Sequence, residues 1–358
     1  MRLSPIFCIL LLAVVTSCLD EIELEIPKGL DENIDIRGEL IMGDPAEITV
    51  YLENVFNFET SSLLAVRARF VELIDAEGNR MEIPSIRDGV YYYQFSNTTD
   101  PIKIAFDQQY KIRVALFNGQ TFESEFERMP RPVGKGQMSV KRTMKSRLDD
   151  NGSLRNFDFA SFFINAPLQT VETGEFARLH WVPQRTFRLT DSAFIAGFVP
   201  TTCYITNSID ITNTYLFDAT VAKSDFVNDF PLSELLLNFE FAEGYYYTIF
   251  QRSLSEGSFN YWKQVQQTFA ADGNIFSPPV GRITSNIRDV DDPEKEAFGY
   301  FSALSQDTVR LYVPPSTFNI PSTCPRQPVM GMPCPFLLCC DCASEAGSQT
   351  TRPDFWEE

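Results

Sequence analysis

The pattern of hydrophobic and polar residues predicts β-strands along most of the chain. In the first part, apolar and polar residues alternate at a spacing of two, as from Ile48 to Leu52. Alternation of this kind places every second side chain on one face of a half-buried strand. Asn118-Gly119, between two such segments, is a sequence typical of a type I′ hairpin turn. About seven short strands with turns between them predict an immunoglobulin-like β-sandwich over residues 35–130.

A larger β-rich domain is predicted over residues 131–315. Pro and Gly residues between 130 and 136 mark the boundary between the two domains. Residues 245–250 are apolar on both faces of the alternation, which indicates a central strand covered on each side. Residues 225–241 contain several leucines, and we predict a short helix there. The fold class is therefore mainly β.

The one conspicuous helix is predicted near residues 259–271. Its apolar face is formed by Phe259, Trp262, Val265 and Phe269. Pro278 and Pro279 prevent its continuation. The Gly/Pro and acidic loops up to Glu296, with Asn286 among them, are predicted to form an exposed connection. We interpret this segment as a structural element that packs a helix on a sheet. Its loops over residues 272–296 are the first place to search for a ligand site.

Two sets of residues carry a resemblance to a known family. The first set follows the predicted helix and reads Tyr261-Trp262, Gly273-Asn274-Ile275-Phe276, Pro278-Pro279-Val280, Ser285-Asn286-Ile287, Asp292-Pro293 and Phe298-Gly299-Tyr300-Phe301-Ser302-Ala303. The second set ends the chain and reads Cys339-Cys340-Asp341-Cys342, Gly347-Ser348 and Arg352-Pro353-Asp354-Phe355-Trp356. The chain resembles the family called domain of unknown function 4249, which consists of predicted outer-membrane lipoproteins of Gram-negative bacteria. The resemblance implies a cellular location and a fold, but no activity.

Residues 1–17 are interpreted as a lipoprotein signal peptide. Their apolar run, Ile6 to Val15, is shorter than the about 20 residues that a membrane-spanning helix needs. Val15-Thr16-Ser17-Cys18 has the order of a lipobox, so we predict cleavage before Cys18 and lipidation of its thiol. The alternative is an ordinary secretory signal followed by a chance cysteine.

Residues 18–34 are predicted to form an acidic tether. Asp20, Glu21, Glu23 and Glu25 follow the lipidation site closely. One interpretation is a solvated charged linker. The resemblance implies another, a surface-export signal of the kind found near the acylated cysteine of some lipoproteins in such bacteria. We expect a protein anchored in the outer membrane and facing the cell surface.

The charge of the chain excludes several classes of partner. A formal net charge of −18 without a basic patch argues against nucleic acid, and direct binding to anionic headgroups is not expected either. His180 is the single histidine, so a serine or cysteine hydrolase would depend on that one residue, and we expect a surface or packing role for it. Gly-rich phosphate loops, Rossmann fingerprints and H-E-x-x-H are missing from the sequence, and we predict no cofactor.

Carboxylates are too abundant here to indicate chemistry. The chain has 48 Asp and Glu residues, so any fold places some of them in pairs. Asp289, Asp291 and Asp292 are a weak calcium candidate, but they lack the spacing and the distal Glu of an EF-hand. We therefore predict no metal site.

The cysteines of the mature chain predict disulfides. Besides Cys18, six cysteines remain after removal of the signal: Cys203, Cys324, Cys334, Cys339, Cys340 and Cys342. An even number in an exported protein favours bridges, and six cysteines allow 15 pairings. We expect bridges that fasten a Cys/Pro-rich tail, residues 316–358, to the second domain, with Cys203 as the docking partner. A zinc knuckle is the alternative.

These features lead to a functional expectation. The chain resembles an accessory of a TonB-dependent transporter, a non-catalytic outer-membrane lipoprotein that captures an unknown ligand or scaffolds the barrel. The first alternative is a structural or adhesive envelope protein. The second is an exported hydrolase that cleaves carbohydrate or peptide. We find no catalytic motif and predict that the protein is not an enzyme.

Overall fold

The computed structural model describes nine parts of the chain, and every structural statement below concerns those parts. They are residues 34–54, 64–96, 99–148, 151–192, 199–209, 214–271, 283–322, 324 and 337–357. The protein is mainly β, with 53% strand and 11% helix. Within these parts, no helix is long and apolar enough to cross a membrane.

The strands form three sheets. The first has 11 strands: β1 (Ile34–Met42), β2 (Glu47–Asn54), β3 (Leu64–Ala65), β6 (Ser85–Arg87), β7 (Val90–Gln94), β13 (Arg178–Thr190), β14 (Thr202–Ser208), β15 (Tyr215–Asp218), β17 (Tyr245–Leu254), β19 (Phe301–Val313) and β20 (Ser348–Gln349). The second has six: β4 (Ala68–Asp75), β5 (Arg80–Glu82), β8 (Gln109–Leu116), β9 (Thr121–Ser124), β10 (Glu127–Arg128) and β18 (Ile287–Asp289). The third has three: β11 (Gln137–Leu148), β12 (Leu154–Pro167) and β16 (Phe226–Leu236).

The helices are few and mostly short. The α-helices are α2 (Ala219–Ala222), α3 (Glu256–Ala271) and α4 (Leu337–Cys340), and single 3-10 turns occupy Phe239–Phe241, Pro315–Thr317 and Cys342–Ser344. In the described parts, α3 is the one helix longer than six residues. It covers the segment predicted near residues 259–271 and begins three residues earlier than predicted.

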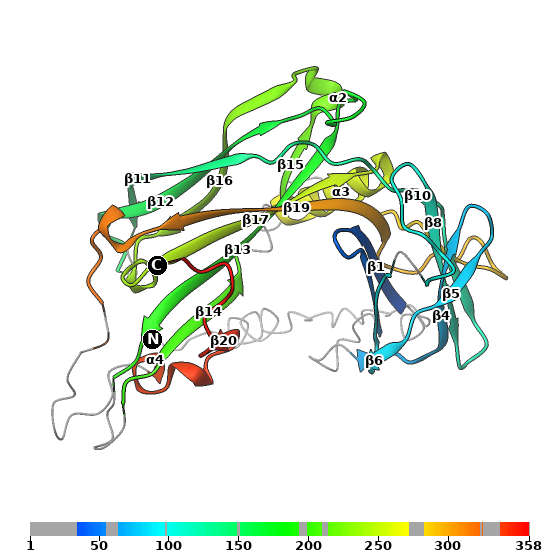
Figure 1. Cartoon of the computed structure of the whole chain (residues 1–358), viewed down its shortest axis with the longest axis horizontal. Helices are drawn as coiled ribbons and strands as arrows, with labels where there is room; N and C mark the ends of the chain where they lie inside the picture. Colours follow the sequence, from blue (N-terminus) through cyan, green and yellow to red (C-terminus); the bar gives the residue numbers. More distant parts are fainter. Residues whose placement is uncertain are drawn as a thin grey trace, which may run out of the picture.

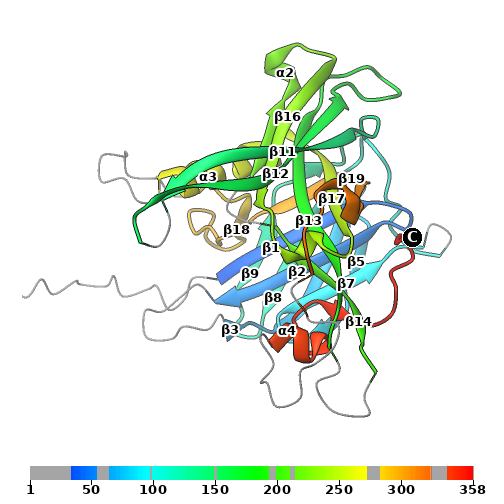
Figure 2. The ribbon, with the colours of Figure 1, turned by 90° about the vertical axis from the view of Figure 1, so that its left-hand side faces the viewer.

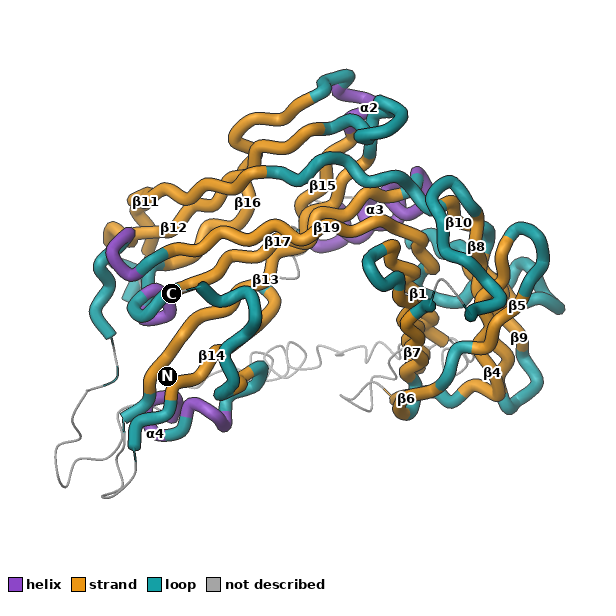
Figure 3. The backbone as a smooth tube through the Cα atoms, in the orientation of Figure 1, coloured by secondary structure: helices purple, strands orange, loops and turns teal. Residues whose placement is uncertain are grey.

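The 11-stranded sheet bends into an arch with β19 at its top (Figure 1). Its strand order is β20-β14-β13-β17-β19-β1-β2-β7-β6. The three-stranded sheet covers the outer side of one half of the arch, and the six-stranded sheet covers the outer side of the other half (Figures 1 and 3). The inner side of the arch is thus formed by a single continuous sheet.

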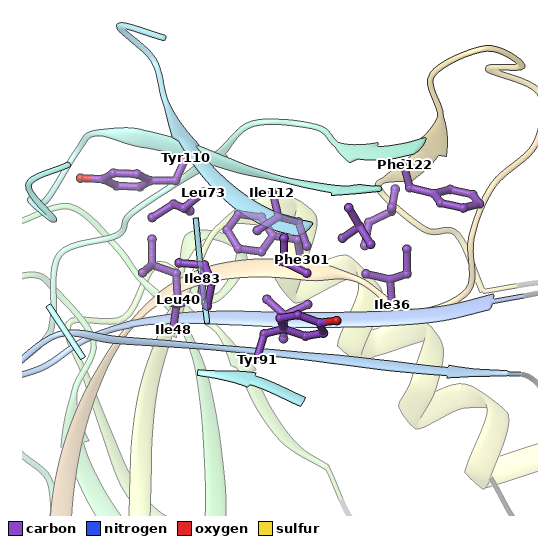
Figure 4. Packing of buried hydrophobic residues seen from close by; sticks show 14 of the residues in the cluster. Ile36, Leu40, Ile48, Leu73, Ile83, Tyr91, Tyr110, Ile112, Phe122 and Phe301 are labelled. Carbon is purple, nitrogen blue, oxygen red and sulfur yellow. The ribbon is translucent and has the colours of Figure 1, made fainter. Parts of the chain in front are cut away.

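β19 connects the two halves because it belongs to both hydrophobic cores. It pairs with β17 in antiparallel fashion and with β1 in parallel fashion. Side chains at odd positions all face the outer side, since side chains alternate along a strand. Phe301 fills the core of the first half, where it lies among Ile36, Leu40 and Ile112 (Figure 4). Twelve residues later, Val313 fills the core of the second half.

The first half is a two-layer sandwich with the predicted alternation. Ile48, Val50 and Leu52 are fully buried in its core. The unit predicted over residues 35–130 also takes in strands that come much later, because β18 pairs with β9 and β19 pairs with β1. The hairpin at Asn118-Gly119 is not the predicted type I′ turn. Gly119 alone has a positive φ there, 96°, and Leu116 N–H donates to the Gln120 carbonyl, which gives a three-residue loop.

The short helix predicted over residues 225–241 is wrong. Most of this segment is β16, which pairs with β12 in a register that places Phe230 beside Ile164. Pro231 lies inside the segment, and a proline within a helix removes a backbone hydrogen bond and clashes with the preceding turn. On an edge strand such as β16 the missing N–H costs little. Pairing with β12 therefore overrides the helical spacing of the leucines.

The tail packs against the second half. β20 pairs with β14, and Trp356 is buried against Tyr204 and Tyr246, with ring centroids 4.9 and 5.0 Å apart. Arg310 lies over the ring of Phe355 at 4.3 Å, which adds a cation–π contact. The end of the chain is thus held by aromatic packing as well as by covalent bonds.

Candidate functional site

A polar cavity lies where the sandwich meets the second half. Its volume is about 490 Å³, and its walls come from β10, the start of β13, the end of β17 and the first turn of α3. The charged and hydroxyl residues that line it include Asp107, Glu125, Glu127, Arg128, Arg131, Glu175, Arg178, Ser255, Glu256 and Tyr300.

Glu127 is the buried carboxylate of the cavity. It is only 6% exposed. The Ser255 hydroxyl donates to its Oε2, and the Tyr300 hydroxyl donates to its Oε1 at 2.5 Å. Asn286 Nδ2 adds a longer contact of 3.5 Å to Oε1. Burial raises the pKa of Glu127, and the donors Ser255, Tyr300 and Asn286 offset part of that rise.

The first turn of helix α3 has features that favour the Glu127 carboxylate beside it. Ser255 precedes the helix, and its Oγ accepts the Ser258 N–H at 3.0 Å, which is an N-cap. The free N–H groups of the first turn and the helix dipole favour an acidic group at this end. Gly257 allows the close approach, because a Cβ there would lie 2.4 Å from the Tyr300 hydroxyl and 3.0 Å from Glu127 Oε1.

Burial and the charge of Glu127 raise the pKa of Tyr300, whereas the hydrogen bond from Tyr300 lowers the pKa of Glu127. Burial is the main reason that the pKa of Tyr300 is raised, and the charge of Glu127 adds to it. The phenol therefore stays protonated and donates to the carboxylate. Because Ser255 and Tyr300 already occupy both carboxylate oxygens, the arrangement works as a latch that joins β10, α3 and the approach to β19.

Ion pairs line part of the cavity. Arg128 and Arg131 contact the two carboxylate oxygens of Asp107 at 2.5 and 2.6 Å. Burial by itself would raise the pKa of Asp107, but the hydrogen bonds from both arginines outweigh it and hold that pKa below its usual value. Arg178 and Glu256, which also line the cavity, form an ion pair at 3.1 Å. The cavity therefore offers both signs of charge to a polar ligand.

The inner face of the arch is a second candidate surface. Helix α3 bounds one end of it, and the aromatic cluster around Trp356 bounds the other. Between them, partly or fully exposed side chains come from β13, β17 and β19: Val182, Gln184, Phe250, Arg252, Gln306, Thr308 and Arg310. Arg252 is fixed by Glu39 of β1 at 3.0 Å, so the two halves are also tied together on this face.

His180 also lies on the inner face of the arch, where α3 covers it. It is 4% exposed, and its ring lies 4.8 Å from that of Trp262 in α3. Burial, with a further contribution from the charge of Arg252, lowers the pKa of His180 to about 3. Its Nδ1 has no hydrogen-bond partner in the described structure. Of the two roles expected for this histidine, packing is the one that the structure shows.

The loops predicted to be an exposed connection are partly buried. Residues 272–282 lie outside the described parts. Asn286 is 4% exposed, and β18 places Ile287 in the sandwich core. The prediction of an exposed loop at Asn286 is wrong, because the chain returns there to pair with β9. The acidic run is exposed only beyond Asp289.

The calcium candidates serve local turns. Asp289 Oδ1 accepts the N–H of Asp291 at 2.9 Å, and Asp292 Oδ1 accepts the N–H of Glu294 at 3.3 Å. Across the described residues, no group of three or more His, Cys, Asp or Glu side chains is placed to hold a metal ion.

Two disulfides hold the tail. Cys203 of β14 is bonded to Cys342, and Cys324 is bonded to Cys339. Cys340 is disulfide-bonded as well. These five sulfurs are then not thiolates, so they cannot form the zinc knuckle of the alternative hypothesis. Cys334 and the predicted lipidation site Cys18 lie outside the described parts.

The cavity could not be found from the sequence. Glu127 and Tyr300 are far apart in the chain. Tyr300 lies in one of the segments that carry the family resemblance, but that resemblance implies no role for it, and Glu127 lies in none of them. Ser255 before the helix and Gly257 in its first turn were the available signals, but they indicate only that a helix starts there.

Comparison with known proteins gives one family. The family model described as "Domain of unknown function (DUF4249)" matches residues 20–310. Comparisons with curated proteins and with solved structures find no match.

Proposed function

The chain belongs to the DUF4249 family, and from that premise we propose that it is a lipid-anchored protein of the outer membrane that serves a TonB-dependent transporter. It faces the cell surface and is not an enzyme. Its task is to capture a substrate for the barrel or to scaffold it. The lipobox at Val15 to Cys18 and the acidic residues after it support the location.

The observation that carries this proposal is the continuous inner sheet of the arch. β19 contributes Phe301 to one core and Val313 to the other, so the two halves are held in one orientation. The Glu127 latch and the Arg252–Glu39 ion pair reinforce the junction. A fixed concave surface with half-exposed aromatic, amide and guanidinium groups suits the presentation of a ligand or the bracing of a partner.

The test is a pull-down of the tagged native protein in mild detergent, followed by mass spectrometry. A barrel protein recovered in about equal amount supports the accessory role. A lipoprotein that is reproducibly recovered alone contradicts it. The matched control is the same chain with Cys18→Ser, which separates association through the protein from association through shared membrane fragments.

The alternatives make different predictions for the same material. A structural or adhesive envelope protein should bind matrix or cells without any barrel. An exported hydrolase should use the cavity, because the buried Glu127 with its raised pKa is the residue there that resembles a general acid. Hydrolysis of a glycan or peptide that disappears in Glu127→Gln, while the fold is retained, would favour that alternative over the accessory role.

A further inference from the structure

The β11–β12 hairpin is longer than the core that it covers. The face that packs on the second core near the base of the hairpin is therefore exposed farther out. Near its base, Phe162 and Ile164 are buried in the second core. Farther out on the same face, Met144, Leu148 and Leu154 are 67%, 70% and 71% exposed. Leu148 is directly opposite Leu154 in the register, and Met144 is opposite Asp158. Paired residues share a face of a sheet, so the three apolar side chains lie on one exposed face, with the polar pair Ser146–Asn156 between Met144 and the two leucines. We call these three apolar side chains the hairpin tip.

The hairpin is a local exception to the acidic charge of the chain. Its Lys and Arg residues are Lys141, Arg142, Lys145, Arg147 and Arg155, and its acidic residues are Asp149, Asp150 and Asp158. Five cations against three anions contrast with the net charge of −18 for the whole chain, but Lys141, Arg142 and Lys145 form ion pairs with acidic residues of β12 and β16. The expectation that the protein avoids anionic headgroups therefore applies least to Arg147, which is exposed next to Leu148.

The hairpin tip lies on the side from which the tether would enter. Figure 2 shows the far end of the hairpin and the beginning of β1 on the same side of the molecule. More apolar side chains are exposed around Ile34, the first residue of β1. Phe117, 73% exposed, lines the same hollow as Ile34. Leu64, 54% exposed, is opposite Asn54, which is in turn opposite Ile34.

We propose that the hairpin tip, together with Phe117 and Leu64, rests on the lipid surface that holds the acyl chains of Cys18. The apolar side chains enter the headgroup region, and Arg147 next to Leu148 contacts a lipid phosphate. The 16 residue steps from Cys18 to Ile34 span at most about 55 Å, so the anchoring bilayer stays within reach of this side. This inference rests on the lipid anchor of the proposed function.

A pair of tryptophan probes tests the contact in the acylated full chain. Leu148→Trp places a probe in the hairpin tip. Val221→Trp is the matched control, because Val221 is 78% exposed on α2, away from the hairpin tip (Figures 1 and 2). Both variants are reconstituted in vesicles of phosphatidylethanolamine with a minority of phosphatidylglycerol, with and without bromine on the acyl chains. After subtraction of the parent signal, bromine should quench Leu148→Trp by about twofold and leave Val221→Trp unchanged.

The outcomes separate this contact from the proposed function. Vesicle-bound protein in which Leu148→Trp is quenched no more than Val221→Trp overturns the contact and leaves the anchor intact. Protein that does not float with vesicles at all overturns both the anchor and the contact. If Leu148→Gln with Leu154→Gln abolishes the recovery of a barrel while Leu148→Trp remains unquenched, the hairpin tip binds protein and not lipid, which also overturns the inference.

Discussion

Asn286 holds the backbone of Phe301 through both atoms of its amide. Its Nδ2 donates to the Phe301 carbonyl at 2.9 Å, and its Oδ1 accepts the Phe301 N–H at 2.9 Å. All these groups are buried. These two hydrogen bonds, which we call the Asn286 bracket, fix the point at which β19 begins. They also fix the position of the Phe301 ring, which fills the core of the sandwich.

Replacing Asn286 should therefore destabilise the protein strongly. In Asn286→Ala both backbone groups of Phe301 lose their partner inside the protein. An unsatisfied buried polar group costs about 1–3 kcal/mol, so we expect the free energy of unfolding to fall by about 2–4 kcal/mol. Urea unfolding followed by circular dichroism measures this. Asn118→Ala, which removes two solvent-exposed hydrogen bonds to Gln120 within a turn, is the control and should lower stability by about 1 kcal/mol at most. Equal effects of the two substitutions would contradict the role of the bracket.

The latch at Glu127 should give stability a defined pH dependence. The pKa of Glu127 is raised in the folded protein above its ordinary value of 4.5. Its contribution is thus fully present below pH 4.5 and is lost as the pH rises through the raised pKa. In Glu127→Gln that loss should disappear, so the variant should gain stability relative to the parent as the pH rises above 4.5.

The difference between the two proteins is the quantity to measure. His180 has a lowered pKa, so it stabilises the fold above the unfolded value of 6.5, and this contribution is lost as the pH falls. That effect opposes the effect of Glu127 but is common to both proteins and cancels in the comparison. Unfolding free energies at several pH values from 4 to 8 give the two profiles. Parallel profiles would show that Glu127 does not titrate with a raised pKa.

The two disulfides should differ in their contribution to stability. Cys203–Cys342 closes a separation of 139 residues, and Cys324–Cys339 closes one of 15. In the chain-entropy description the longer loop is worth about 5 kcal/mol and the shorter about 3 kcal/mol. Cys203→Ser with Cys342→Ser should therefore lower the unfolding midpoint more than Cys324→Ser with Cys339→Ser. A larger loss from the second pair would show that local strain or packing, not loop closure, decides the effect.

The sequence predicts the local parts of this fold better than their assembly. Alternation along residues 48–52 correctly indicated a buried strand, and the helical spacing from Phe259 correctly indicated α3. The disulfide-held tail followed from six cysteines in a chain with a predicted export signal. Each of these signals lies within one short segment, where a period or a composition is enough to decide the structure.

The assembly depends on pairings between distant segments. Nothing in the sequence near Phe301 shows that β19 runs parallel to β1 or that its side chains belong to both hydrophobic cores. Glu127, Ser255 and Tyr300 meet only because that pairing brings α3 to the edge of the sandwich. The same reason explains the error over residues 225–241, where the leucines had the spacing of a helix but β12 offered a strand partner. The exposed apolar side chains of the hairpin tip could not be predicted from the sequence either. Alternation shows which side chains share a face of a strand, but it does not show where the core under that face ends.

Gly257 gives the sharpest test of how α3 meets the latch. A Gly→Ala change inside an exposed helix stabilises it by up to about 1 kcal/mol. Here a Cβ would lie 2.4 Å from the Tyr300 hydroxyl, which is pinned by its hydrogen bond to Glu127. We expect Gly257→Ala to destabilise the protein by about 1–3 kcal/mol instead, as overpacking does. Tyr300→Phe removes the obstructing oxygen, so the same glycine substitution in that background should cost much less. A double-mutant cycle of unfolding free energies measures the coupling, and additive effects would show that the helix does not press on Tyr300.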